Sequence, residues 1–321
     1  MEQSWSNSHI FLSDQALLDF QHRSLQGYNF VVAHHRESDK FHGVLGLISP
    51  SFYVDREISV GDDLWLAIWK VDKELSESSS LGLDLLDYAV QKFEPKSVSA
   101  IGINESVALL YRIMGFKVAK MNHWFVPNFE ARKSKLITGA YSRDVPSQDS
   151  RVSARWLDIE SEHAVASFLS GQSGRANPNY ITARYLKHPV FHYGFVGIFE
   201  DDQSILALAV GREVSVGGAK AFRLTELFVS EGNDPSFGAV FQPFMLSNGY
   251  DYIDFVEFGF DEGVIKSLGF MKSREDLYVP HLFEPFVAER REVTIAYRSE
   301  GPFVCTKGDS DLDRPNVGGV K

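Results

Sequence analysis

The stretch at residues 64–126 constrains the fold most, because strand-like and helix-like segments alternate along it at short intervals. Residues 64–71 (LWLAIWKV) form an apolar run of strand length, and residues 97–103 (SVSAIGI) form another. Between them, residues 83–93 carry apolar side chains at helical spacing. Strands that are apolar on both sides are typical of the centre of a sheet covered on both faces. The alternation therefore predicts a layered α/β fold.

Two features of this stretch could carry chemistry. The serine-rich loop at residues 74–82 leads into a predicted helix, whose N-terminal N–H groups and dipole favour an anion. Further on, Asn104, Tyr111 and Gly115-Phe116 follow one another at intervals of seven and four residues. The GNAT family of acyl-CoA N-acyltransferases closes its signature with an Asn at a strand end, a Tyr and a Gly-Phe at this spacing. The chain resembles that family here.

The resemblance implies the transfer of an acyl group from an acyl-CoA donor to a primary amine. The donor would be acetyl-CoA, its carbonyl held by a backbone N–H of strand 66–71, and Tyr111 would donate a proton to the departing thiolate. An attacking ammonium must also lose a proton, and His42 and His123 are the candidate bases. The residues expected to bind the cofactor are Trp69, Val71, Ser79, Ser80, Leu81, Gly82, Leu83 and Asn104.

Each of these features also has a structural interpretation. Tyr111 could simply pack its helix on the sheet, Asn104 could cap that helix, and the serine loop could be a solvated turn. Glu77 stands where the family has Gln or Arg, and Ser80 stands where a Gly is usual. An acidic side chain would repel a pyrophosphate unless it points outward. The alternative function is a tandem GNAT-fold protein that binds or scaffolds without catalysis and has lost CoA binding.

A polar, turn-rich segment divides the chain. Residues 131–150 have the composition of a linker, and we interpret residues 1–130 and 151–321 as two domains. The order of predicted strands and helices in the second domain repeats that in the first. We therefore expect a mixed α/β fold of two tandem GNAT-like domains, each a central mixed sheet flanked by helices.

Short sequence matches favour internal duplication. RIMGF at residues 112–116 precedes WFVPNF, and KSLGF at residues 266–270 precedes YVPHLF. The second domain nevertheless lacks both chemical features. Nothing Gly-rich follows Val229, and Lys266 stands near the place of Tyr111. We expect the second domain to be a degenerate copy.

Acidic residues interrupt apolar strands of the second domain at Glu226, Asp254 and Glu257. Buried carboxylates are costly unless they are paired. These three could bind substrate, as a polar pocket for a sugar or an amine, or they could form salt bridges with Arg223 or Arg212. A third interpretation places them in a cleft between the domains, where they would serve a different transfer reaction.

The chain closes with KGDSDLDRPN at residues 307–316, in which every second residue from Asp309 to Asp313 is acidic. This spacing matches part of a Ca²⁺ loop, but the loop's Gly at position six and Glu at position twelve are missing. We therefore expect a structured turn that packs on a domain, and no metal. The tail also resembles that of tandem GNAT proteins of bacterial surface-polysaccharide biosynthesis. That resemblance implies an amino-sugar acceptor, such as a nucleotide-linked one.

Composition limits the partners further. The chain has 43 acidic and 32 basic residues, a net charge of −11, which argues against nucleic acid because phosphate neutralisation needs a basic face. The single Cys305 cannot form an internal disulfide, which indicates a reducing compartment. We see neither a signal peptide nor an apolar run long enough for a membrane span. We expect a cytoplasmic protein whose partners are a small-molecule amine and, in a homodimer, a second copy.

Overall fold

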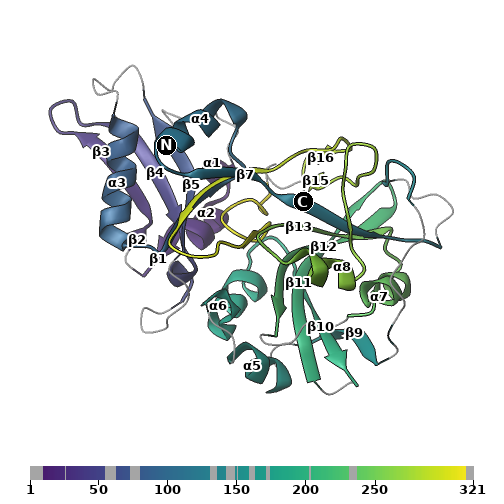
Figure 1. Cartoon of the computed structure of the whole chain (residues 1–321). Helices are drawn as coiled ribbons and strands as arrows, with labels where there is room; N and C mark the ends of the chain where they lie inside the picture. The colour runs from purple at the N-terminus through teal and green to yellow at the C-terminus, as the bar shows by residue number, and fades with distance from the viewer. Residues whose placement is uncertain are drawn as a thin grey trace.

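The computed structural model describes residues 10–25, 27–54, 63–72, 80–130, 136–141, 149, 151–158, 163–170, 174–201, 204–230 and 237–315. Two open sheets dominate these residues, one of six strands and one of eight (Figure 1). Both sheets mix parallel and antiparallel neighbours, and helices pack on them. The predicted mixed α/β class is therefore confirmed.

The first sheet is built mainly from the N-terminal part of the chain. Its strands, in spatial order, are β3 (Phe30–His35), β4 (Lys40–Ile48), β5 (Asp63–Val71), β6 (Ser97–Ile101), β17 (Thr294–Ser299) and β7 (Lys117–Lys120). Helices α3 (Leu81–Phe93) and α4 (Glu105–Ile113) cover one face, and α1 (Ile10–Ser13) and α2 (Gln15–His22) cover the other. Successive residues of β5 serve the two faces: Ile68 packs on the α2 side and Trp69 on the α3 side.

The second sheet is larger and lies beside the first. Its strands, in spatial order, are β14 (Met271–Lys272), β8 (Asn122–Pro127), β13 (Tyr252–Phe258), β12 (Ala219–Val229), β11 (Ser204–Val216), β10 (Gly194–Glu200) and β9 (Val152–Leu157), with β18 (Cys305–Thr306) paired to β13. Helices α7 (Phe241–Asn248) and α8 (Glu262–Ser267) pack on one face. The other face carries α5 (His163–Ser170), α6 (Pro178–Ile181) and the π-helical turn η3 (Thr182–Leu186).

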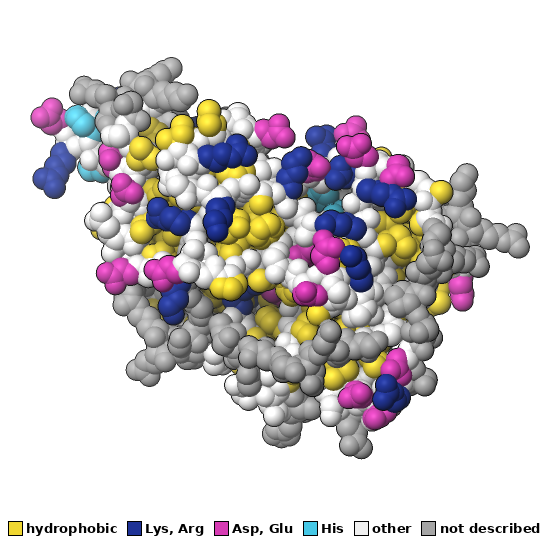
Figure 2. Space-filling view, in the orientation of Figure 1, with side chains coloured by type: hydrophobic (Ala, Val, Ile, Leu, Met, Phe, Trp, Pro, Cys, Tyr) yellow, Lys and Arg dark blue, Asp and Glu magenta, His cyan; other side chains and the backbone are white. Residues whose placement is uncertain are grey.

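Short elements complete the described chain. They are the hairpin of β1 (Arg23–Ser24) with β2 (Gly27–Tyr28), the hairpin of β15 (Leu282–Phe283) with β16 (Phe286–Val287), and the 3₁₀ turns η1 (Pro50–Phe52) and η2 (Gly174–Ala176). No helix among the described residues is long and apolar enough to cross a membrane. Figure 2 shows basic and acidic side chains interspersed on one face, unlike the one-signed basic strip typical of nucleic-acid-binding proteins.

The two sheets exchange one strand each, which corrects the assignment made from sequence. β8, expected as the last strand of the first domain, pairs with β13 in the second sheet, and the two lie side by side in Figure 1. β17, expected in the second domain, lies between β6 and β7 in the first sheet. The strand pattern predicted which residues are buried but not which sheet receives them. The domain limits at residues 130 and 151 remain a prediction about folding units.

The two sheets share one irregularity, a bulge in a strand that has an antiparallel neighbour on one side and a parallel neighbour on the other. β5 is bulged at Ala67, because Gly46 pairs with Ile68 while Leu47 pairs with Leu66. β12 is bulged at Thr225 in the same manner, between the pairs Val210↔Glu226 and Gly211↔Leu224. Each bulged strand also has one parallel neighbour, β6 for β5 and β13 for β12. The shared device adds to the evidence for duplication.

Candidate functional site

The first candidate site is the place where β5 and β6 part. Their parallel pairing covers only Asp63↔Ser97 to Trp65↔Ser99, although β5 continues to Val71. We call this opening, between residues 66–71 and the end of β6, the first fork. The bulge at Ala67 lies directly inside it. Backbone groups on such a strand edge can pair with an extended ligand.

The N-terminus of α3 lies beside the first fork. A Cβ atom on Gly82 would lie 3.5 Å from Trp69 Nε1 and 3.6 Å from Val71 Cγ2, so the first turn of the helix touches the end of β5. The first intrahelical bond runs from Asp84 N to the Ser80 carbonyl oxygen (3.0 Å), which leaves the preceding amides pointing out of the helix. Leu81 and Leu83 belong to this turn. The structure thus brings Trp69 and Val71 of β5 together with the first turn of α3, as predicted for the cofactor residues. Ser79 and the acidic Glu77 lie outside the described residues.

Tyr111 faces the same strand from α4. Its ring contacts the rings of Trp69 (5.9 Å between centroids) and Phe116 (5.3 Å), both edge to face. Only 6% of Tyr111 is exposed, and this burial raises the pKa of its hydroxyl, so the phenol is protonated at neutral pH. The ring therefore packs the helix on the sheet, and the hydroxyl is in the form that an acid requires.

Asn104 begins α4 at the end of the first fork. Its backbone carbonyl oxygen accepts a hydrogen bond from Val107 N at 3.1 Å, whereas its side chain makes no capping bond. The side chain is exposed. A side-chain cap, one of the two interpretations of Asn104, is therefore not what the structure contains.

The two candidate bases lie in different sheets. His42 on β4 is half-buried, stacks on His35 (4.9 Å between centroids) and lines a cavity of about 660 Å³ with Lys70 and Asp72. This cavity lies on the α1 and α2 side of the first sheet. His123 was assigned to a first-domain strand, and that assignment is wrong, because β8 belongs to the second sheet.

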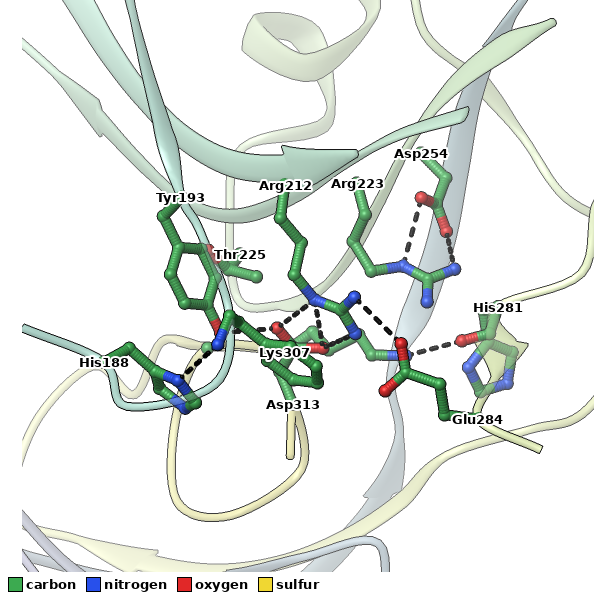
Figure 3. A network of polar contacts seen from close by, with 12 residues as sticks. His188, Tyr193, Arg212, Arg223, Thr225, Asp254, His281, Glu284, Lys307 and Asp313 are labelled. Carbon is green, nitrogen blue, oxygen red and sulfur yellow. Dashed lines mark hydrogen bonds and ion pairs between the residues drawn. The ribbon is translucent and has the colours of Figure 1, made fainter. Parts of the chain in front are cut away.

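His123 is part of a buried ion cluster with Asp254 and Arg223. Its Nε2 shares a hydrogen bond with Asp254 Oδ2 (3.1 Å), and burial lowers its pKa. Asp254 is also held by Arg223, from Nε to Oδ1 at 3.2 Å and from Nη2 to Oδ2 at 2.9 Å (Figure 3). Burial opposes ionisation of Asp254, but the neighbouring Arg223 and the bond from His123 hold its pKa below the usual range. Asp254 therefore forms the predicted salt bridge with Arg223.

The other two carboxylates have partners as well. Glu257 accepts hydrogen bonds from Asn122 Nδ2 (2.9 Å), Trp124 Nε1 (2.7 Å) and Phe260 N (3.1 Å), which tie β8 to β13. Glu226 accepts from the Tyr185 hydroxyl at 3.0 Å, and burial raises its pKa. None of the three carboxylates lines the cavity beside His42. A role in substrate binding remains a prediction for them.

The tail is an ordered turn that packs on the second sheet, as the sequence predicted. Arg212 holds Asp313 through Nε to Oδ2 and Nη2 to Oδ1, both at 3.0 Å (Figure 3). Arg175 pairs with Asp309, and also lies 3.4 Å from Glu226 Oε1. No group of His, Cys, Asp and Glu side chains in the described part of the chain could hold a metal ion. Sequence reasoning missed Arg175, which stands alone in a polar loop without a spacing signal.

Comparison with known proteins supports the fold. No protein-family model matches the sequence, and no curated protein matches it significantly. A GCN5-related N-acetyltransferase from Anabaena variabilis is similar in structure, with a TM-score of 0.54 and 11% identity over 92% of this chain and 68% of that one. A tandem GNAT protein from the clavulanic acid biosynthesis pathway reaches 0.43 at 12% identity, over 86% of this chain and 85% of that one. The chain thus has a GNAT acetyltransferase-like fold.

Proposed function

We propose that this protein is an N-acyltransferase that moves an acetyl group from acetyl-CoA to a primary amine. One observation carries the proposal: the bulge at Ala67, the N-terminus of α3 at Gly82 and the Tyr111 ring all converge on the open edge of β5. In this fold, function must be argued from the site, because the fold alone hosts many activities.

The residues of the first fork suit an acyl-CoA. The edge of β5 at residues 66–71 can pair with the amide groups of an extended pantetheine arm. The amides of Leu81, Gly82 and Leu83, at the positive end of the α3 dipole, would hold the pyrophosphate. Trp69 and Val71 would line the path between these two points. Acetyl-CoA supplies the acyl group as a thioester, which an amine can attack directly.

The first fork also supplies groups for the chemical step. A backbone N–H freed by the bulge would stabilise the negative charge that develops on the carbonyl oxygen as the amine nitrogen bonds to the carbonyl carbon. Tyr111 would give its proton to the sulfur as the carbon–sulfur bond breaks. The proton lost by the amine would pass to a base. His42 serves this role best in our proposal, because it lies beside the end of β5, where Asp72 N donates to the His42 carbonyl oxygen (2.8 Å), whereas His123 lies in the second sheet.

The cavity beside His42 is the proposed acceptor site. Its volume of about 660 Å³ suits a small molecule, and Phe30, Phe41 and Tyr28 line it. An amino sugar can place its ring face on an aromatic side chain while its hydroxyl groups bond to charged residues such as Lys70. A nucleotide-linked amino sugar of surface-polysaccharide synthesis is the acceptor we propose on the strength of the tail resemblance.

Calorimetric titration with acetyl-CoA tests the proposal, together with the Tyr111→Phe variant. We expect micromolar binding by both proteins, and a fall in acetyl transfer to amino sugars by about 100-fold or more in the variant, since general acid catalysis contributes that much. Tyr88→Phe, at an exposed tyrosine of α3, is the matched control and should leave both unchanged. Absence of binding at millimolar acetyl-CoA would contradict the proposal and favour a non-catalytic binding or scaffolding protein.

A further inference from the structure

The second sheet contains the same fork, but the chain's own tail lies in it. Parallel pairing of β12 with β13 ends at Leu224↔Phe255, next to the bulge at Thr225. We call the opening beyond this pair the second fork. Here β18 pairs antiparallel with β13 through Glu257↔Thr306. The tail occupies a position that the described residues of the first fork leave without a strand.

The tail is hydrogen-bonded to both arms of the second fork. Lys307 N donates to the Val256 carbonyl oxygen of β13 at 2.9 Å, and Gly308 N donates to the Thr225 carbonyl oxygen of β12 at 3.1 Å. These bonds bridge the two strands where they no longer bond to each other. An extended peptide that pairs with strand edges in this way is the pattern of β-augmentation.

The fit at the bulge admits only a glycine. A Cβ atom on Gly308 would lie 2.6 Å from the Thr225 carbonyl oxygen and 2.5 Å from the Tyr185 hydroxyl, both shorter than any real contact. Thr306 and Cys305 beside it are completely buried. The backbone of the tail therefore lies directly against the bulge, with no room for a side chain between them.

Three arginines of the second half hold the tail from one side. Arg184 Nη2 donates to the carbonyl oxygens of Gly308 and Ser310, each at 2.9 Å. Arg175 and Arg212 hold the tail carboxylates of Asp309 and Asp313, as described above. These arginines come from segments that precede β12, whereas both of these carboxylates come from the tail. The second half therefore supplies the cationic groups of a binding site, and the tail supplies the carboxylates and carbonyl oxygens that occupy it.

We infer that the second fork is a peptide-binding groove whose resident ligand is residues 305–313 of the same chain. The peptide takes the place that corresponds to the donor arm in the first fork. The consequence is a single acyl-donor site per chain, in the first half. This consequence rests on the proposed function, whereas occupancy of the second fork by a bound peptide does not.

Cutting the full-length folded protein separates the ligand from the receptor. A protease site inserted at Gly301 lies in an exposed turn, where a Cβ atom would meet nothing within 4 Å. After cleavage we expect the tail to co-elute with the rest of the chain in gel filtration. An excess of fluorescent peptide FVCTKGDSDLDRP, residues 303–315, should exchange into the groove.

Peptide variants test the contacts. The Asp313→Ala peptide should bind on the order of 100-fold more weakly, because it leaves Arg212 buried without its carboxylate. The Gly308→Val peptide should not bind measurably. Asp311→Ala is the matched control and should bind like the parent, because Asp311 pairs with Arg314 inside the tail itself. Loss of the tail on cleavage without rebinding, or equal affinity of the parent and Asp313→Ala peptides, would overturn the inference.

Acetyl-CoA added to the cleaved protein tests the consequence. We expect one equivalent to bind while the tail stays in place. Two equivalents, or release of the tail peptide by acetyl-CoA, would show that the second fork accepts the donor and would overturn the assignment of a single site. If no acetyl-CoA binds, the proposed function fails, and the peptide affinities still decide whether the tail is a groove-bound ligand.

Discussion

The two forks are built in the same way, but only the second is occupied by a strand of the described chain. Each has a bulged strand that leaves its parallel neighbour, at Ala67 in the first half and at Thr225 in the second. Beyond the first bulge lie the start of α3 and the Tyr111 ring, whereas beyond the second lies a strand of the protein itself. The comparison teaches that, among the described residues, one backbone device can be left without a strand or be filled by another segment of the same chain.

Buried charge distinguishes the forks as clearly as their contents do. Tyr111 lies in an apolar cluster with Leu86 and Phe116. The second fork is surrounded by ion pairs in which Arg212, Arg223 and Asp313 are almost completely buried. Desolvated ions stabilise a fold only when each keeps its partner, so such a network specifies one arrangement. Buried arginines of the second half therefore depend on the tail for carboxylate partners.

Breaking an ion pair of the second fork should have the largest effect. The Arg212→Met variant leaves Asp313 buried without its main partner, and we expect the free energy of unfolding to fall by about 3–5 kcal/mol. Urea denaturation measures the loss. Lys266→Met, which breaks the exposed pair with Glu262, is the control and should cost less than about 1 kcal/mol. Similar losses of unfolding free energy in the two variants would mean that the buried pair contributes no more to stability than an exposed one.

A pH titration of stability sharpens the same contrast. Burial and the neighbouring Arg223 lower the pKa of Lys307 to about 7, from 10.5 in an unfolded chain. Between these values the unfolded chain binds a proton at Lys307 that the folded protein does not, so raising the pH favours the folded state. From pH 7 to 9 the free energy of unfolding should rise by about 2 kcal/mol more in the parent than in Lys307→Met. If the urea midpoint changed equally in the parent and in Lys307→Met between pH 7 and 9, Lys307 would not be the titrating group.

A charge added at the first fork should have the smallest effect on stability, and it should affect acetyl-CoA binding selectively. Gly82→Asp adds a carboxylate to the first turn of α3, where it complements the helix dipole and should stabilise the fold by about 0.3–1 kcal/mol. The same charge should repel a pyrophosphate and weaken acetyl-CoA binding by about tenfold. Gly301→Asp, in an open turn, controls for net charge. Unchanged affinity in Gly82→Asp would remove α3 from the proposed donor site.

Local elements were predictable because they depend on neighbours in sequence. The interval from Asn104 to Tyr111 placed these residues at the start and on the buried face of α4. The Gly-Phe pairs end helices because Gly115 and Gly269 adopt positive φ angles of 81° and 102°, which favour glycine. The apolar runs became β5 and β6 for the same local reason, since both faces of a central strand are covered.

The candidate site was predictable only in part. Gly82, Trp69 and Tyr111 meet because a strand, a helix start and the next helix are connected in one order in this fold. His123 follows the Asn104–Phe116 stretch closely in sequence, yet it bonds to Asp254, 131 positions later in the chain. Nothing in the local pattern around His123 points to that partner, because side-chain alternation sets the face of a strand and not its neighbour.

By itself, the sequence determined the order of strands and helices, their buried faces, the helix ends and the spacing that places Tyr111 beside β5. Only the tertiary structure decided that β8 and β17 cross between sheets, that the tail enters the second fork, and which arginine meets which carboxylate. The physical reason is the distance in sequence over which each interaction acts. Propensity and periodicity act over a few residues, whereas a strand partner or a buried ion pair is selected by global packing among segments that can be more than 100 residues apart.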